Sequence, residues 1–454
     1  MLIGIGVWAF LVYITIVLLS TTALKRSIAE SLLIGLITVC LFSGRDFFQN
    51  IMQSMIIGFQ SEVVFAIMLF MVMSKIMEQT GIIDRLVTIL NSLLGRFRGG
   101  PAYIATCASA LFGMISGSGT GNAATVGAIT VPWMIRTGWP KEIAALINSG
   151  NAGLGIALPP SSSMLTMLGF AAVAELVTSN SLYMALLCGG LYTLAYRLIR
   201  VALYVKKYSI QATPKEDLVS FSCAIKHGGS SLAMFLGIII PLLLTMGPLS
   251  TLLKNQESYG SDGVKSINII VWVPVLIIAI CAIEGRKYMP RSRKDWWKFG
   301  MSVKKSCVSA GCTSVFALAG STALANIGFG DDLQALMSSL NMPKVLIVFC
   351  VGVITVLLCG PLGASQATVC VGPVVFSILV SAGVAPVLAV VVFLVIASTE
   401  GTMPPSTAPA LISCGMAEVE DVKVIYKPLV LHYVLPILCI GILLSLGILP
   451  VVYI

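Results

Sequence analysis

Charge is scarce in this sequence, and that scarcity excludes whole classes of protein. Only 10% of the 454 residues are Asp, Glu, Lys or Arg, and 57% are hydrophobic, whereas a soluble domain carries about 25% charged residues. The two histidines form no grouping with a serine or carboxylate that would suit catalysis. No nucleotide-binding Gly-x-x-x-x-Gly-Lys-Ser/Thr signature occurs either. The sequence therefore excludes a soluble enzyme, and we expect no enzyme activity, no catalytic residues and no direct use of ATP.

The twelve cysteines show no spacing typical of metal ligands and lie mostly in apolar stretches. In a membrane they are most simply small apolar packing residues. We expect no organic cofactor and no metal centre.

Long apolar stretches recur along nearly the whole chain, and a membrane span needs about 20 such residues. The sequence predicts ten to twelve membrane segments and an all-α polytopic membrane protein. The first stretch, Leu2–Ser20, lacks a basic start and a small-residue cleavage site, so we expect a retained helix rather than a secretory signal.

Basic residues lie beside the apolar stretches rather than in one patch, so topology explains the net charge of +9. One cluster runs from Arg197 to Lys226 and a second from Arg286 to Lys305, and both are predicted to face the cytoplasm. The second cluster, with Trp296 and Trp297, is predicted to be an interfacial amphipathic helix.

An internal repeat carries the functional prediction. The first copy reads FGMISGSGTGN at 112–122 and LGIALPPS at 154–161, and the second reads LCGPLGASQ at 358–366 and EGTMPPS at 400–406. Gly117 precedes Pro159 by 42 positions, and Gly360 precedes Pro404 by 44. The matched spacing makes chance a poor explanation.

A Gly/Ser break inside an apolar stretch must face protein or a water-filled cavity, because unpaired backbone groups in hydrocarbon cost several kcal/mol each. The arms around each break are predicted to be too short to span, which describes re-entrant helical hairpins. The Pro-Pro motifs predict a discontinuous helix in each copy, since proline removes an N–H donor. Such paired broken elements are typical of a transporter's central site. Simple close packing of helices is the alternative, and the doubled motif favours the transport site.

The order of several motifs resembles the large membrane subunit, the M or DctM-like component, of tripartite ATP-independent periplasmic (TRAP) transporters. The motifs are GIIDRL at 81–86, LGRFRGG at 94–100, ISGS at 115–118, VP at 131–132 and GNAGLGIALPPS at 150–161. The resemblance covers nearly the whole chain and implies an elevator-type secondary active transporter of the ion-transporter superfamily. It implies symport of a small organic anion of the carboxylate or dicarboxylate class with sodium.

The resemblance also implies the ligands. The cation sites would use Ser116, Ser118, Asn122, Gly153, Gly155 and Ala157 in the first copy and Gly360, Gly363, Ser365, Thr399, Glu400, Gly401 and Met403 in the second. The substrate would lie between the tips, at Gly117, Gly119, Pro160, Ser161, Pro361, Pro405 and Ser406. Hydroxyl and carbonyl oxygens suit a hard cation such as sodium. Glu400 departs from the family pattern, and because a carboxylate at membrane depth is costly we expect it to hold a cation or take up a proton.

The resemblance divides the chain into scaffold and transport regions and names its partners. We expect N-terminal scaffold helices at 1–80, a first repeat at 81–200, a cytoplasmic connector at 201–229, second-half scaffold helices and an interfacial arm at 230–306, a second repeat at 307–428 and a C-terminal helix at 429–454. The expected partners are a small four-helix membrane subunit, an extracytoplasmic solute-binding protein, the anionic substrate and the bilayer of a bacterial inner membrane, with no nucleic acid. The alternatives are a stand-alone sodium- or proton-coupled carboxylate symporter and a non-transporting membrane scaffold subunit.

Overall fold

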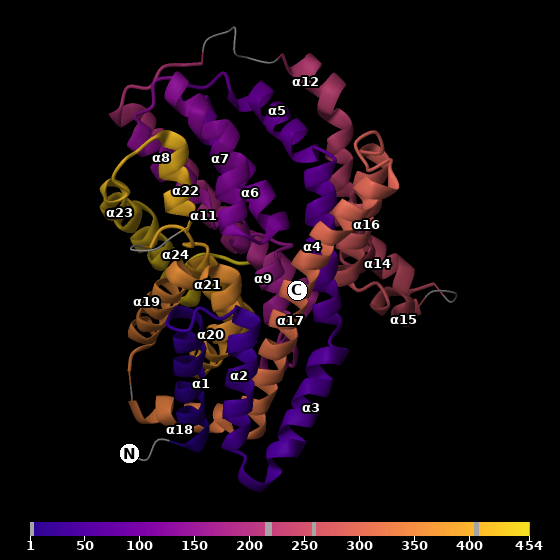
Figure 1. Ribbon diagram of the computed structural model, residues 1–454, viewed down its shortest axis with the longest axis vertical. Helices are drawn as coiled ribbons and strands as arrows, with labels where there is room; N and C mark the ends of the chain where they lie inside the picture. The colour runs from indigo at the N-terminus through magenta and orange to yellow at the C-terminus, as the bar shows by residue number, and fades with distance from the viewer. Residues whose placement is uncertain (1–3, 214–219, 257–259, 341, 404–407, 454) are drawn as a thin grey trace.

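The chain folds as a bundle of α-helices of very different lengths (Figure 1). The computed structural model describes residues 4–213, 220–256, 260–340, 342–403 and 408–453. Within these ranges the only extended pairing is an isolated bridge between Arg98 and Ala212, and no strand forms. The predicted all-α class is confirmed.

Six helical segments in the described part of the chain are long and apolar enough to cross a membrane. They are α1 (Ile5–Thr22), α11 (Ser179–Lys207), the segment 221–245, α17 (Arg293–Asn326), α20 (Ala364–Ser381) and the segment 423–445. A further crossing can be made by α3 (Phe47–Gln60) and α4 (Glu62–Gln79), which meet at a 45° bend. The sequence predicted ten to twelve membrane segments. By length and composition the described chain has six spans, or seven with the bent pair, beside several shorter apolar helices, so the protein is multi-pass.

One group of helices is built around α17. This helix packs against α2 (Ile28–Leu41), α3 and α4, and α1 packs on α2. Next to α4 lies α16 (Ile269–Glu284), which in turn packs on α13 (Leu236–Thr245). At one end, Arg85 of α5 (Ile82–Leu94) pairs with Glu284 of α16 at 2.7 Å, which ties the chain leading into the first repeat to this group.

The predicted interfacial helix is not a separate element. The structure starts α17 at Arg293, where the Ser292 hydroxyl accepts a hydrogen bond from the Asp295 N–H, and continues it to Asn326. No proline follows Pro290 in this stretch, so nothing interrupts the helix before it reaches its apolar half. The predicted boundary between 306 and 307 therefore falls inside a helix.

The predicted connector is also partly helical. The preceding helix α11 continues to Lys207, and α12 (Phe221–Gly228) begins behind a Ser220 cap. The 3₁₀ segment η4 (Gly229–Phe235) then joins α12 to α13, so that 221–245 forms one crossing. Residues 214–219 lie outside the described part.

Two helical hairpins occupy the predicted positions. The first comprises α6 (Gly100–Ser116) and α7 (Gly119–Arg136), and the second α19 (Lys344–Leu362) and α20. Each arm has 17–19 residues, because helix continues almost to the tip. The prediction that every arm is too short to span is wrong for α20, which has spanning length.

A discontinuous helix follows each hairpin, as the Pro-Pro motifs predict. In the first repeat α8 (Lys141–Asn151) is followed by η2 (Leu154–Ala157) and α9 (Ser162–Gly169). In the second, α21 (Pro386–Ala397) and α22 (Ala408–Ala417) flank a break. The remaining elements are η1 (Gly44–Asp46), α10 (Ala171–Ala174), α14 (Gly247–Lys254), α15 (Gly260–Lys265), α18 (Phe329–Leu340), α23 (Lys423–Leu429), the π-helical turn η5 (Val430–Val434) and α24 (Leu435–Ser445).

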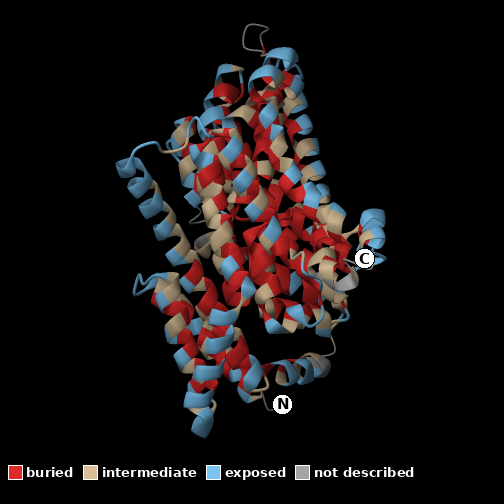
Figure 2. Ribbon diagram, turned by 90° about the vertical axis from the view of Figure 1, so that its right-hand side faces the viewer, coloured by how far each residue is buried: buried red, intermediate tan, exposed pale blue. Residues whose placement is uncertain are grey.

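The broken elements lie in the interior. Buried residues form a continuous central mass, and exposed ones lie on the outer helices (Figure 2). In α21 every residue from Ala389 to Ala397 is buried. At the first repeat, η2 touches α6 so closely that a Cβ on Gly155 would overlap the backbone of Gly113. The hairpin tip and the first break are therefore packed as one unit.

Replacing Gly155 by alanine should lower the melting temperature of the purified protein, because the added methyl group has no space against α6. Overpacking of this kind costs about 1–3 kcal/mol. Gly300→Ala, at an exposed position of α17, is the matched control: its Cβ would meet open space, and alanine is the better helix former. Equal melting temperatures for the two variants would show that α6 and η2 are not packed as described.

Candidate functional site

The first hairpin tip is a two-residue turn between α6 and α7. Gly117 has φ of 61°, a conformation that glycine adopts without strain, and a Cβ here would also collide with the Ser162 hydroxyl of α9. The Ser118 hydroxyl caps α7 by accepting from the Gly121 N–H at 3.1 Å. Ser116 makes two long contacts with Ser118: its hydroxyl donates to the Ser118 carbonyl and accepts from the Ser118 N–H, both at 3.5 Å. The two predicted ligand serines therefore lie together at the tip, and Ser118 already has a capping role.

Asn122 stands one turn inside α7 and is fully buried. Its side-chain amide donates to the carbonyls of Ser109 at 3.1 Å and Ala152 at 2.8 Å, and so holds α6 and the first break against α7. Its amide oxygen is buried without a partner among the described residues. A buried acceptor left unpaired is rare in native structures and marks a place for water or an ion.

Two further asparagines, neither of them among the predicted site residues, have similar contacts. Asn148 donates to the carbonyl of Ala123 and the hydroxyl of Ser413, and Asn151 to the hydroxyl of Thr106. Their amide oxygens are also buried without a partner in the described part of the chain. The sequence does contain a feature that points to them: the two asparagines lie three positions apart in an apolar segment, where polar side chains are costly.

The predicted carbonyl ligands of the first break are partly occupied. The carbonyls of Gly153 and Gly155 accept hydrogen bonds from Ile156 and Leu158 inside the 3₁₀ turn. Ser161 closes the break: its hydroxyl accepts from the Met164 N–H and donates to the Ile156 carbonyl. Two predicted residues, Ala157 and Pro160, are buried in this same segment. The Ser161 hydroxyl thus satisfies one N–H and one carbonyl that the break leaves free.

The second tip is a single glycine. Gly363, with φ of 84°, joins α19 to α20. Two residues later the Ser365 hydroxyl donates to the carbonyl of Gly117 at 2.7 Å, so the two tips are in direct contact. Pro361 belongs to the last turn of α19, and Pro405 and Ser406 lie outside the described residues. The structure thus brings together the tip residues that were predicted from two distant segments.

Glu400 lies where the two tips meet. It is 6% exposed, and its carboxylate accepts hydrogen bonds from the backbone N–H groups of Gly119 and Ala364, at the starts of α7 and α20. A Cβ on Gly119 would stand 2.6 Å from its carboxyl carbon, and one on Gly363 would stand 3.3 Å from its Oε1. Glycine at these positions lets both backbones approach the carboxylate.

The other residues of the second break are fixed by short contacts. The Thr399 hydroxyl donates to the Ile396 carbonyl at 2.7 Å, and the Ser149 hydroxyl donates to the Gly401 carbonyl at 2.6 Å. Gly360 faces Met403, whose carbonyl would lie 3.2 Å from a Cβ there. The predicted second-copy residues in the described part therefore surround Glu400 or hold its loop.

Arg197 lies elsewhere than the sequence predicts. It was assigned to a cytoplasmic basic cluster, yet it is fully buried and donates to the carbonyl of Ser398 at 2.9 Å. Its Nε and its other terminal nitrogen have no partner among the described residues. The carbonyls at the end of a helix carry partial negative charge, so a guanidinium is favourable there. Because Arg197 precedes several other basic residues in the sequence, the pattern of charges did not indicate that its side chain points inward.

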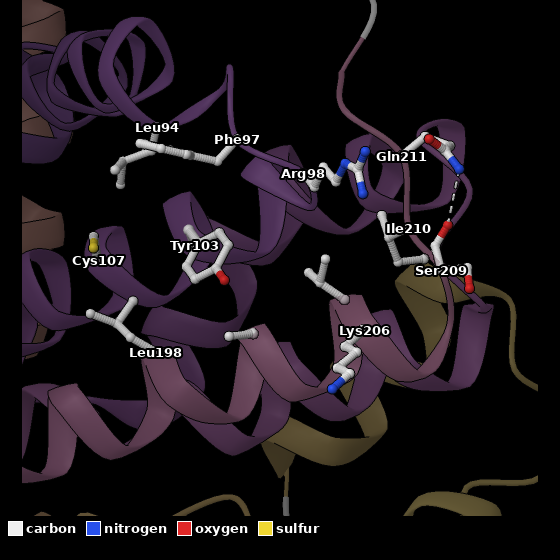
Figure 3. Close-up of a pocket in the computed structure, with 12 residues that line it drawn as sticks. Leu94, Phe97, Arg98, Tyr103, Cys107, Leu198, Lys206, Ser209, Ile210 and Gln211 are labelled. Atoms are coloured by element: carbon white, nitrogen blue, oxygen red, sulfur yellow. Dashed lines mark hydrogen bonds between the residues drawn. The ribbon is translucent and has the colours of Figure 1, made fainter.

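A cavity outside the tips does not belong to this site. It measures about 1000 Å³ and lies between α5, α6 and the end of α11. Figure 3 shows Leu94, Tyr103 and Leu198 along its wall, with Arg98 and Lys206 toward one end.

Within the described residues no cluster of His, Cys, Asp and Glu could hold a metal. The chemistry that the tips offer is backbone N–H groups for an anion and oxygen atoms for a hard cation.

A protein family model matches the chain over nearly its whole length. The family model described as "Tripartite ATP-independent periplasmic transporter, DctM component" matches residues 10–450. The chain is 29% identical over 184 residues to the C4-dicarboxylate TRAP transporter large permease protein DctM of Pseudomonas aeruginosa, covering 40% of this chain and 42% of that protein. It is 25% identical over 208 residues to the sialic acid TRAP transporter permease protein SiaT of Haemophilus influenzae, covering 45% and 32%. The chain thus spans less than half the length of either relative.

Two solved structures share the fold. The YdaH transporter of Alcanivorax borkumensis superposes with a TM-score of 0.66 at 17% identity, covering 89% of each chain. MtrF of Neisseria gonorrhoeae superposes with a TM-score of 0.66 at 15% identity, covering 90% of this chain and 86% of that one. At this identity the likeness establishes the helical membrane fold alone.

Replacing Asn122 by alanine should destabilise the protein by about 1–3 kcal/mol, because two buried carbonyls lose their donor. Thermal unfolding in detergent measures the loss. Asn255→Ala, at an exposed position after α14, is the control and should leave the melting temperature unchanged. An equally small effect at both positions would contradict the clamping role of Asn122.

Proposed function

Because the chain belongs to the DctM component family of the tripartite ATP-independent periplasmic transporters, we propose that it imports a small organic anion in symport with sodium. A member of this family is a large permease component of a TRAP transporter, not an enzyme. The observation that carries the substrate site is the contact between the two hairpin tips, where the starts of α7 and α20 converge. Helix N-termini favour negative charge and offer unpaired N–H donors.

An access route supports an anionic substrate. A cavity of about 730 Å³ between α2 and α17 reaches Gln366, on the first turn of α20 behind the second tip. Lys304 and Lys305 line this cavity, together with one acid, Glu30. Two cations on the path would concentrate anions near the site. By the positive-inside rule the same lysines face the cytoplasm, so this cavity serves release on that side.

We place the coupling cation at the first tip, on the side that faces away from the second tip. Asn122 follows the predicted ligand Ser118 by four positions, and its amide oxygen is buried without a partner among the described residues. Its amide nitrogen contacts the backbone carbonyl of Asn151 at 3.5 Å, so the first break lies beside it. Oxygen ligands without thiol or imidazole suit a hard cation such as sodium. The carboxylate or dicarboxylate class follows the substrates that the relatives' names give, C4-dicarboxylates and sialic acid.

The mode of action and the partners follow the family. We assign the broken elements to a moving transport region and the helices around α17 to a static scaffold, which gives an elevator mechanism in a bacterial inner membrane. A small membrane subunit and a periplasmic solute-binding protein complete the transporter. Much of the substrate selectivity then resides on the binding protein, since the tips present mainly backbone.

Sodium should raise the melting temperature of the detergent-purified chain above its value in potassium or choline chloride, because a ligand of the folded state stabilises by mass action. At one hundred times the dissociation constant the gain is about 2.7 kcal/mol. The Ser116→Ala/Ser118→Ala variant should lose this response.

Ser302→Ala, at an exposed position on α17, is the control and should keep the full sodium response. A rise of equal size in all three salts would overturn sodium coupling. A sodium-specific rise that survives in the double variant would instead move the cation site away from the first tip.

A further inference from the structure

The cavity between α5, α6 and the end of α11 is apolar at one end and basic at the other. Its volume is about 1000 Å³, and pockets of about 300–1,000 Å³ hold organic molecules rather than single ions. Leu94, Cys107 and Leu198 lie at one end, and Arg98 and Lys206 lie toward the other (Figure 3). An occupant that suits both ends has an apolar body and a negatively charged group.

The basic end is formed by the protein itself and has charge to offer. Arg98 and Lys206 line it, and no acidic residue is among the residues that line the cavity. Neither cation forms an ion pair within the described part of the chain. Backbone contacts fix the position of Arg98, which forms a bridge with Ala212, while the neighbouring Gly99 N–H donates to the Gln211 carbonyl at 3.3 Å. The charged end is therefore in place before any ligand binds.

The apolar wall runs along one face of each of two helices. Tyr103 and Cys107 are one turn apart on α6, and Leu198 and Val205 lie two turns apart on α11. Lys206 follows Leu198 by eight positions, so α11 rises by about 12 Å between them. One half of the hydrocarbon core of a bilayer is about 15 Å thick. The wall therefore reaches from the basic end through most of one leaflet.

The helix surfaces beside this cavity face the hydrocarbon. Leu93 and Phe97, near the end of α5, are 50% and 58% exposed, and Ile199 and Leu203 on α11 are 59% and 51% exposed. Since α11 is long and apolar enough to span, a molecule dissolved in the bilayer can enter between these side chains. The basic cluster that contains Lys206 is predicted to face the cytoplasm, and the cytoplasmic leaflet is the one that carries anionic lipids.

We propose that this cavity binds an anionic phospholipid of the cytoplasmic leaflet, with its phosphate at the end formed by Arg98 and Lys206 and one acyl chain along α6 and α11. Basic pockets between membrane helices on the cytoplasmic side suit such headgroups. The pair of Arg85 with Glu284 ties α5 to the helices around α17, whereas α6 carries the first hairpin tip. The lipid therefore bridges the helices around α17 and the hairpin, at a place where neither the coupling cation nor the substrate binds.

Native mass spectrometry of the delipidated, detergent-purified chain measures this binding. Dioleoylphosphatidylglycerol should bind more tightly than dioleoylphosphatidylcholine, which has the same acyl chains and a headgroup without net charge. In the Arg98→Gln/Lys206→Gln variant the affinity for phosphatidylglycerol should fall about fivefold for each lost cation, about 25-fold in all. The affinity for phosphatidylcholine should change less, because it gains less from the two charges.

Arg293→Gln/Lys294→Gln is the matched control. It removes the same charge from exposed positions on α17 that do not line the cavity, and it should bind phosphatidylglycerol as the unmodified protein does. Cys107→Trp keeps both cations and fills the apolar end, so it should weaken the binding of both phospholipids. If Cys107→Trp cannot be purified folded, Ala202→Trp, at an exposed position of α11 that lines the same cavity, replaces it.

Four results would overturn the proposal. The first is equal affinity of the unmodified protein for the two phospholipids, and the second is an equal loss of affinity in the α17 control, which would indicate attraction by net charge alone. The third is binding of glycerol 3-phosphate as tight as that of phosphatidylglycerol, which would assign the basic end to a soluble phosphate. The fourth is a dimer that Cys107→Trp abolishes, which would assign the cavity to a second copy of the chain.

Discussion

Unpaired backbone groups at the ends of broken helices govern how this protein is arranged. A broken helix in hydrocarbon leaves N–H and C=O groups whose burial without a partner costs several kcal/mol each. The chain meets that cost with side chains that stand beside each break. Ser118 caps α7, Ser161 closes the first break, and Ser149 reaches across to the Gly401 carbonyl. Ser149 of the first repeat thus serves the second, and Ser365 of the second donates to the Gly117 carbonyl of the first. Because each repeat satisfies a carbonyl of the other, the breaks can be stable only when they lie together in the interior.

The two buried charges follow the same rule with opposite signs. Arg197 donates to the Ser398 carbonyl at the end of α21, where the helix dipole is negative. Glu400 accepts from the starts of α7 and α20, where it is positive. Neither charge needs the other as a partner, since each compensates a helix end. This explains how a loop of the second break can hold an acid within three residues of an arginine contact without an ion pair.

The hairpins and breaks could be predicted because glycine, serine and proline interrupt apolar runs. Few backbone structures are compatible with such interruptions inside a membrane. Their mutual contact was predictable only through the repeat, since nothing local in Ser365 points to Gly117. The inward orientation of Arg197 and the contacts of Asn148 and Asn151 could not be predicted from the sequence pattern. A run of basic residues or an isolated amide does not indicate which face of a helix packs against the rest of the protein. The continuity of α17 was missed for the opposite reason: tryptophans and lysines suit both an interface and the start of a long helix.

The two repeats share a backbone design and differ in what they place inside it. The first offers a neutral oxygen atom, that of Asn122, one turn from a tip where Ser118 is already used as a cap. The second supplies a carboxylate, Glu400, that reaches back to the first tip. The two repeats therefore differ in the chemistry that they place at equivalent breaks. The first presents a neutral dipole, which suits a cation, whereas the second presents a carboxylate that the positive ends of two helices compensate.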